Sequence, residues 1–219
     1  MWDEATLSML VQGIGETLYM TLASAFFAYV IGLPIGILLV TSAKGGIRPC
    51  EGLFKTLDVI VNLTRSIPFL ILLVAVLPFT RIVVGTTLGS TATIVPLTLS
   101  AAPFIARIVE SSIKEVDVGV IEAAQSMGAS TLQIIWKVML PEARPSLIVG
   151  SAIATTTILG YSAMAGFVGG GGLGTIAINY GYYRYQSDLM FVTVVLMVLI
   201  VQVLQSAGMK AAGLSDRRK

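Results

Sequence analysis

Long apolar stretches alternate with shorter polar ones along the whole chain. Five of the apolar stretches hold about twenty residues each, the length that a helix needs to cross the hydrocarbon core of a bilayer. The sequence therefore predicts an all-α integral membrane protein with five spans in a single domain, residues 1–219. The expected spans are residues 18–41, 57–79, 91–109, 145–167 and 189–209.

One polar stretch, residues 117–143, carries helix signals of its own. Asp117 is suited to cap a first short helix, and Gly128 suits the left-handed position that ends it. Ser130 followed by Gln133 has the form of a capping box, which predicts a second short helix. A unit of this kind projects from a membrane domain as a rigid plug for a partner.

The second short helix is predicted to place its apolar residues on one face, because they recur at helical spacing. These residues are Leu132, Ile135, Trp136 and Met139. Pro141 disfavours helix at Leu140 and is expected to close the unit. Pro145 fits the first turn of the span that follows.

Composition supports the membrane assignment and excludes several kinds of chemistry. The chain has 219 residues, of which 55% are hydrophobic and 12% charged, and its mean hydropathy is +0.88; soluble domains carry about 25% charged residues. The single cysteine, Cys50, excludes an internal disulfide, and the absence of histidine excludes His-based metal and triad chemistry. No Lys or Arg precedes Lys44, so the first span is expected to be retained rather than cleaved as a signal peptide.

The distribution of Lys and Arg predicts the orientation, because cytoplasmic loops are rich in these residues. Eleven of them fall on the side of the polar unit: Lys44, Arg48, Lys55, Arg107, Lys114, Lys137, Arg144, Lys210, Arg217, Arg218 and Lys219. Arg81 and Arg184 fall on the other side. The N-terminus is therefore expected outside the cell, and the polar unit and the C-terminus in the cytoplasm.

The polar unit resembles the EAA signature of ABC importer permeases. The matching residues are Glu122-Ala123-Ala124, Gly128 four residues after them, and Leu140-Pro141 at the far end. In that family the signature forms the cytoplasmic coupling helix, which docks into a groove of the ATPase subunit. The resemblance implies the same ATPase-coupling role for these six residues.

The chain as a whole resembles the permeases of methionine-type ABC importers. The stretches that carry the resemblance begin NLTRSIPFLILL, IVPLTLSAAPF, IEAAQSMGAS and LGYSAMAGFVGGGGLG. The resemblance implies a type I importer fold in the bacterial inner membrane and a homodimer of permeases. It also implies two separate ATPase subunits that bind ATP and Mg, an external substrate-binding protein that is periplasmic or lipid-anchored, and methionine, in L and often D form, as substrate.

Arg65 is the one basic residue that lies well inside an apolar span, away from its ends. A charge there is costly unless it faces protein, water or headgroups. It either lies near the cytoplasmic mouth of a translocation path or reaches the membrane surface beside Asp58. Arg65, Ser66 and Pro68 resemble an element of amino-acid ABC permeases, which favours the first interpretation.

The fourth span is rich in small residues, among them Gly150, Ala154 and Gly160. Such residues either let helices pack tightly or leave a smooth lining along a symmetry axis. Tyr161 and Met164, next to Ser162, are bulky among these small residues. Tyr161 and Met164 are candidates for a constriction, and Ser162 is a candidate residue of the same path or gate.

Other chemistry finds no support in the sequence. Residues 169–174 contain GxGxxG, but these glycines end a membrane helix, whereas a dinucleotide site needs a preceding soluble strand. A Walker A sequence is absent, and no catalytic constellation occurs, so the chain is expected to be a transport subunit with no enzymatic activity, cofactor or metal. A permease for a different small amino acid or related solute remains an alternative, as does a stand-alone secondary transporter, although that class shows intramembrane acidic residues or an inverted repeat.

Overall fold

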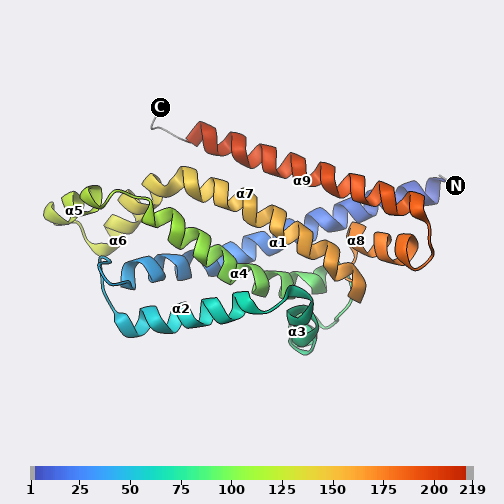
Figure 1. Ribbon diagram of the computed structural model, residues 1–219, viewed down its shortest axis with the longest axis horizontal. Helices are drawn as coiled ribbons and strands as arrows, with labels where there is room; N and C mark the ends of the chain where they lie inside the picture. Colours follow the sequence, from blue (N-terminus) through green and yellow to red (C-terminus); the bar gives the residue numbers. More distant parts are fainter. Residues whose placement is uncertain (1–2, 216–219) are drawn as a thin grey trace. The chain divides into compact units, whose positions relative to one another are not determined.

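The computed structural model describes residues 3–215, and every regular element in that range is helical (Figure 1). The α-helices are α1 (Glu4–Ser42), α2 (Glu51–Ser66), α3 (Phe69–Val84), α4 (Ser90–Lys114), α5 (Val118–Ser126), α6 (Thr131–Ile134), α7 (Leu140–Met164), α8 (Gly172–Ile176) and α9 (Ser187–Ser215). π-helical turns occupy Ile135–Met139 and Ala177–Tyr182, and a 3-10 turn occupies Ala165–Val168. The predicted all-α class is confirmed.

Four helical stretches in the described part of the chain are long and apolar enough to cross a membrane. The number rises to five if α2 and α3 together form one broken span. The first helix is longer than the predicted span 18–41, since it begins at Glu4. Asp3 precedes it and accepts hydrogen bonds from the hydroxyl and the backbone N–H of Thr6, which hold the pKa of the Asp3 carboxyl below its ordinary value.

The predicted span 57–79 corresponds to two helices, separated at Ile67 and Pro68. Pro68 has an extended ψ of 133° and immediately precedes α3. A proline disfavours helix in the residue before it, so α2 ends at Ser66. The sequence placed this interruption near the start of a span, whereas each of the two helices is 16 residues long.

The chain divides into two compact units, and the division cuts α1, α4 and α7 near their middles. Within the described residues, unit 1 contains residues 3–27, 67–101 and 155–205. Unit 2 contains residues 28–66, 102–154 and 206–215. Unit 2 holds the polar segment 117–143 together with the helix ends that lead into it.

Two glycines of α1 let it pack closely on α4 inside unit 2. A Cβ atom at Gly32 would lie 2.6 Å from the carbonyl oxygen of Ala102, and one at Gly36 would lie 2.6 Å from that of Ala106. Both are closer than a real Cβ can approach. The sequence GLPIG was expected to allow a kink, but its two glycines serve the close approach of two helices, as in other small-xxx-small contacts.

The glycine-rich segment after α7 is held by α1 inside unit 1. The carboxylate of Glu16 accepts a hydrogen bond from the backbone N–H of Gly172 at 2.6 Å, and the hydroxyl of Thr17 accepts one from Leu173 at 2.9 Å. Gly171 and Gly172 have φ of +84° and +70°, and a Cβ on either would meet these capping side chains. The glycines therefore serve a tight turn and the start of α8.

Candidate functional site

The first short helix of segment 117–143 has the ends that its sequence predicts. Asp117 precedes α5, and its side chain accepts a hydrogen bond from the backbone N–H of Gly119 at 2.6 Å. Gly128 follows the helix with φ +78°, and its N–H donates to the carbonyl of Gln125 at 2.9 Å. The predicted cap and the predicted left-handed glycine are both confirmed.

The second short helix begins as predicted. The backbone N–H of Ser130 donates to the Gln133 side chain at 2.8 Å, and the backbone N–H of Gln133 donates to the Ser130 hydroxyl at 3.4 Å. This reciprocal pair is a complete capping box. The helices α5 and α6 and the π-helical turn Ile135–Met139 lie together at one end of unit 2 (Figure 1). We call these three elements the coupling unit.

The predicted end of the coupling unit at Leu140 and Pro141 is wrong. Leu140 has helical φ and ψ of −68° and −44°, and a single run of helical turns extends from Thr131 to Val168. The turn immediately before Pro141 is π-helical, and this wider turn makes room for a proline ring that would otherwise clash with the preceding turn. Pro145 accordingly lies inside α7 rather than in its first turn.

The predicted apolar face of the second helix is only partly buried. Ile135 and Met139 are buried, but Leu132 and Trp136 are 68% and 64% exposed. The buried stripe includes Ile134, which rotates it away from Leu132 and Trp136 around the helix. Two large apolar side chains are therefore left on the outer surface of the coupling unit.

The three residues of the EAA sequence differ in their surroundings. Glu122 and Ala123 are exposed, while Ala124 is only 5% exposed. The carbonyl of Ala124 accepts a hydrogen bond from the N–H of Ala129 at 3.1 Å, which ties α5 to the turn that follows it. Ala124 therefore belongs to the inside of the coupling unit, and Glu122 and Ala123 to its surface.

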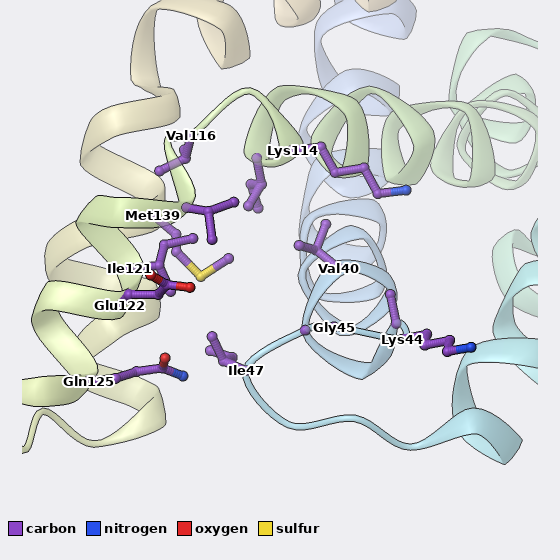
Figure 2. Close-up of a pocket in the computed structure, with 14 residues that line it drawn as sticks. Val40, Lys44, Gly45, Ile47, Lys114, Val116, Ile121, Glu122, Gln125 and Met139 are labelled. Atoms are coloured by element: carbon purple, nitrogen blue, oxygen red, sulfur yellow. The ribbon is translucent and has the colours of Figure 1, made fainter.

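A pocket of about 330 Å³ separates α5 from the loop that follows α1. Figure 2 shows Glu122 and Gln125 of α5 pointing towards this loop, with Ile47 on the opposite side and Met139 at the back. The lining combines apolar side chains with the Glu122 carboxylate, the Gln125 amide and the two lysines Lys44 and Lys114. The coupling unit is thus bordered by a pocket on the side that faces the loop after α1.

The candidate pathway residues near the helix break are largely exposed. Arg65, Ser66 and Pro68 are exposed, and none of the ion pairs found within residues 3–215 includes Arg65. The Ser66 hydroxyl donates to the carbonyl of Asn62 at 2.8 Å. Asp58, expected as a possible partner of Arg65, pairs with Arg107 instead.

The candidate constriction lies at the end of α7 in unit 1. The ring of Tyr161 stacks on that of Phe69, with centroids 4.6 Å apart and planes 6° from parallel. Met164 is 40% exposed, whereas Ser162 is 1% exposed and donates to the carbonyl of Leu159 at 2.7 Å. Of the three candidate residues, Met164 is thus the most exposed, while Ser162 is buried.

The small residues of α7 do not all serve the same purpose. A Cβ atom at Gly150 would overlap the side chain of Ile108, so α7 and α4 are closely packed there. A Cβ atom at Gly160 would have nothing within 4 Å among the described residues outside its own helix turn. Tight packing within this chain therefore explains Gly150 but does not explain Gly160.

Comparison with known proteins decides the family. The family described as the binding-protein-dependent transport system inner membrane component matches residues 32–218. The chain belongs to this family. The permease is 47% identical over 207 residues to the probable D-methionine transport system permease protein MetI of Vibrio cholerae, covering 94% of this chain and 92% of the relative.

Further relatives agree in sequence and in structure. The D-methionine transport system permease protein MetI of Escherichia coli K12 is 52% identical over 164 residues, which are 75% of this permease and 76% of the relative. A chain of a solved structure of the MetNI methionine ABC transporter in inward-facing conformations is 49% identical and has a TM-score of 0.97, with 98% of this permease and 100% of that chain covered. The expected type I importer permease fold is confirmed.

The sequence could not reveal two polar clusters that the fold assembles. One joins Arg107 to Asp58, 49 residues earlier, and the other joins Glu16 to Gly172, 156 residues later. An acidic residue inside an otherwise apolar helix was the available signal for Glu16. Within residues 3–215 no group of three or more acidic, His or Cys side chains could hold a metal ion.

Proposed function

We propose that this permease is the membrane subunit of an ATP-driven importer that moves methionine, in L and possibly D form, across the bacterial inner membrane by alternating access. The observation that carries this proposal is the agreement with the MetNI methionine transporter over 98% of the chain at 49% identity. The names of the relatives point to the same solute. A permease for another small amino acid is the alternative.

The proposed complex contains two copies of the permease, two ATPase subunits and an external substrate-binding protein. Five spans are few to enclose a path, whereas a twofold dimer supplies ten. ATP and Mg belong to the ATPase subunits, and this chain holds no cofactor of its own. The exposed position of Gly160 is suited to close contact with a second copy.

Docking of the ATPase is assigned to the outer surface of the coupling unit. This surface presents Met127, Leu132 and Trp136, which are 82%, 68% and 64% exposed. Large exposed apolar side chains on a polar segment mark an interaction site. Glu122 and Ala123 extend the same role, while Ala124, Gly128, Leu140 and Pro141 hold the unit in shape.

The translocation path is assigned to the helix break and the end of α7. In this proposal Arg65, Ser66 and Pro68 border the path at the break, and Tyr161 and Met164 form the constriction. Ser162 supports the constriction from inside the helix. The Phe69 ring, stacked on Tyr161, fixes the direction of that side chain.

Transport can be tested with the permease, its ATPase and its binding protein reconstituted in vesicles. ATP-dependent uptake of labelled L-methionine is expected, with unlabelled L-methionine as the strongest competitor and D-methionine as a second competitor. Absence of methionine uptake, together with ATP-dependent uptake of a different labelled amino acid, would favour the alternative solute. Uptake without the ATPase would instead indicate a secondary transporter.

The proposed orientation predicts the reactivity of Cys50. This residue is exposed in the loop before α2, on the side assigned to the cytoplasm. An impermeant maleimide is expected to leave Cys50 unmodified when added outside intact cells and to modify it in inside-out vesicles. Cys50→Ser is the control for labelling of other groups. Modification of Cys50 from outside intact cells would show that the predicted orientation is the wrong way round.

Trp136 provides a test of the docking surface. Trp136→Glu places a charge on the exposed apolar surface without touching the buried Ile135 and Met139. The variant is expected to insert normally but to bind the ATPase at least about tenfold more weakly, as for a central aromatic residue of an interface. Trp136→Phe keeps the apolar contact and is the matched control. Equal ATPase co-purification with all three permeases would exclude Trp136 from the interface.

A further inference from the structure

A network of charged side chains joins α2 to α4 inside unit 2. The guanidinium of Arg107, on α4, donates to the carboxylate of Asp58 and, at 2.8 Å, to the side-chain oxygen of Asn62, both on α2. It also donates to Glu110 at 2.5 Å, and Lys114 donates to the other oxygen of Glu110 at 2.7 Å. We call these five residues the Arg107 network.

The network is balanced in charge and partly buried. Its two cations face two carboxylates, and the side chains of Glu110 and Arg107 are only 6% and 20% exposed. Removing one partner from such a group leaves a charge with little access to water, which costs far more than the loss of an exposed pair. The Lys55–Glu51 pair on the same α2 is 70% and 79% exposed and offers a contrast within one helix.

An apolar contact lies beside the network and joins the same helices. Val61 of α2 falls between Asp58 and Asn62 in sequence, and it packs with Leu39 of α1 and Ala106 of α4. All three side chains are at most 2% exposed. The helix α2 is therefore attached to α4 both by charge and by apolar packing along one side.

The connection from α4 to the coupling unit is short. Lys114 ends α4, and α5 begins at Val118. Of the residues around this junction, Ile113 and Val116 are 2% and 4% exposed, so it is packed rather than loose. This packed junction joins α5 to the C-terminal end of α4, where Arg107, Glu110 and Lys114 follow one another on neighbouring turns.

We propose that Arg107 is a positioning residue that makes α2 move together with the coupling unit as one body. The inference rests on the proposed coupling function of α5 and α6. It gives α2, which ends at the break before Pro68, a part in transport although α2 is separated in sequence from the coupling unit. The compact grouping of α2, the C-terminal half of α4 and α5 in unit 2 supports it.

The motion is tested by a distance measurement in the reconstituted complex. Spin labels replace Leu63 on α2 and Val120 on α5, which are 64% and 45% exposed, in a Cys50→Ser background. The distance between the labels is expected to stay the same in the nucleotide-free and ATP-bound complexes. Asp58→Leu is expected to broaden the distance distribution or make it depend on nucleotide, whereas Glu51→Gln is expected to leave it unchanged.

The consequence for transport is measured as methionine taken up per ATP hydrolysed. Asp58→Leu is expected to lower this ratio roughly two- to thirtyfold, the range typical of residues that carry coupling between sites. Asp58→Asn keeps an oxygen that can accept from Arg107 and is expected to retain more of the ratio. If Asp58→Leu fails to assemble, the double variant Asp58→Leu/Arg107→Leu replaces the pair with apolar side chains and supports the same two measurements.

The outcomes separate this inference from the proposed function. A label distance that changes between nucleotide states in the otherwise unaltered complex would overturn the inference, as would a normal distance and a normal uptake ratio in Asp58→Leu. Neither result would contradict the proposed methionine uptake, because that uptake is measured in the complex without the Asp58 substitution. Failure of methionine uptake in the unaltered complex would overturn the proposed function. Comparing the label distance between the unaltered permease and Asp58→Leu would still test whether Asp58 holds α2 to α5.

Discussion

Replacing Ala124 by tryptophan is expected to abolish ATP-driven uptake while the permease still inserts into the membrane. Ala124 is 5% exposed, and α5, which carries it, packs against the π-helical turn after α6. An indole cannot fit there without moving one of the two, and overpacking of this kind costs about 1–3 kcal/mol. The two short helices should separate, so the docking surface loses its shape and the ATPase detaches or hydrolyses ATP without transport.

Ala123→Trp is the matched control, because Ala123 is the exposed neighbour on the same helix. That variant should keep the fold of the coupling unit and affect uptake only through contact with the ATPase. Uptake, ATP hydrolysis and co-purification of the ATPase can be measured side by side for both variants. Normal values for Ala124→Trp in all three would show that the coupling unit is not the coupling surface.

The parts of the coupling unit that the sequence predicts correctly are those fixed by near neighbours. Asp117 caps a helix two residues away, and Ser130 and Gln133 satisfy each other across three residues. Gly128 is the residue type that tolerates a left-handed backbone. Each of these signals depends on the local chain alone, so it can be interpreted without the fold.

The errors arise where distant contacts decide. Pro141 is a helix breaker by local rules, yet the π-helical turn before it keeps the helix continuous. The side of the second helix that becomes buried is set by what packs against Ile134 and Ile135, which periodicity does not specify. The resemblance to ABC importer permeases predicted the family and the type I importer fold correctly.

Polar contacts inside the apolar helices are the least predictable from sequence. The charge count treats Arg107 only as a cytoplasmic residue, and proximity in sequence pairs Asp58 with Arg65. The fold joins Arg107 to Asp58 across 49 residues, because α2 and α4 pack side by side at the Leu39–Val61–Ala106 cluster. Hydrophobic patterning identifies the helices but does not determine which polar side chains meet between them.

Gly128→Val is expected to weaken ATPase binding and uptake strongly, for a reason that lies in the backbone alone. Among residues 3–215, no atom beyond Gly128 and its two chain neighbours lies within 4 Å of a Cβ built on Gly128, so a side chain has space there. Its φ of +78° is nevertheless a conformation that costs an L-residue about 1–2 kcal/mol, and a β-branched side chain more. The turn is expected to open and to redirect α6 away from α5.

Gly128→Asn separates this cause from crowding, since asparagine also adds a side chain but adopts the left-handed region more readily. The asparagine variant should keep most of the ATPase binding and uptake that the valine variant loses. Both can be compared with the unaltered permease by co-purification of the ATPase and by uptake in vesicles. Equal loss in the two variants would mean that the space around Gly128 is filled in the complex, which would place the glycine in contact with the ATPase. No loss in either variant would show that the left-handed turn at Gly128 is not needed to hold the coupling unit in shape.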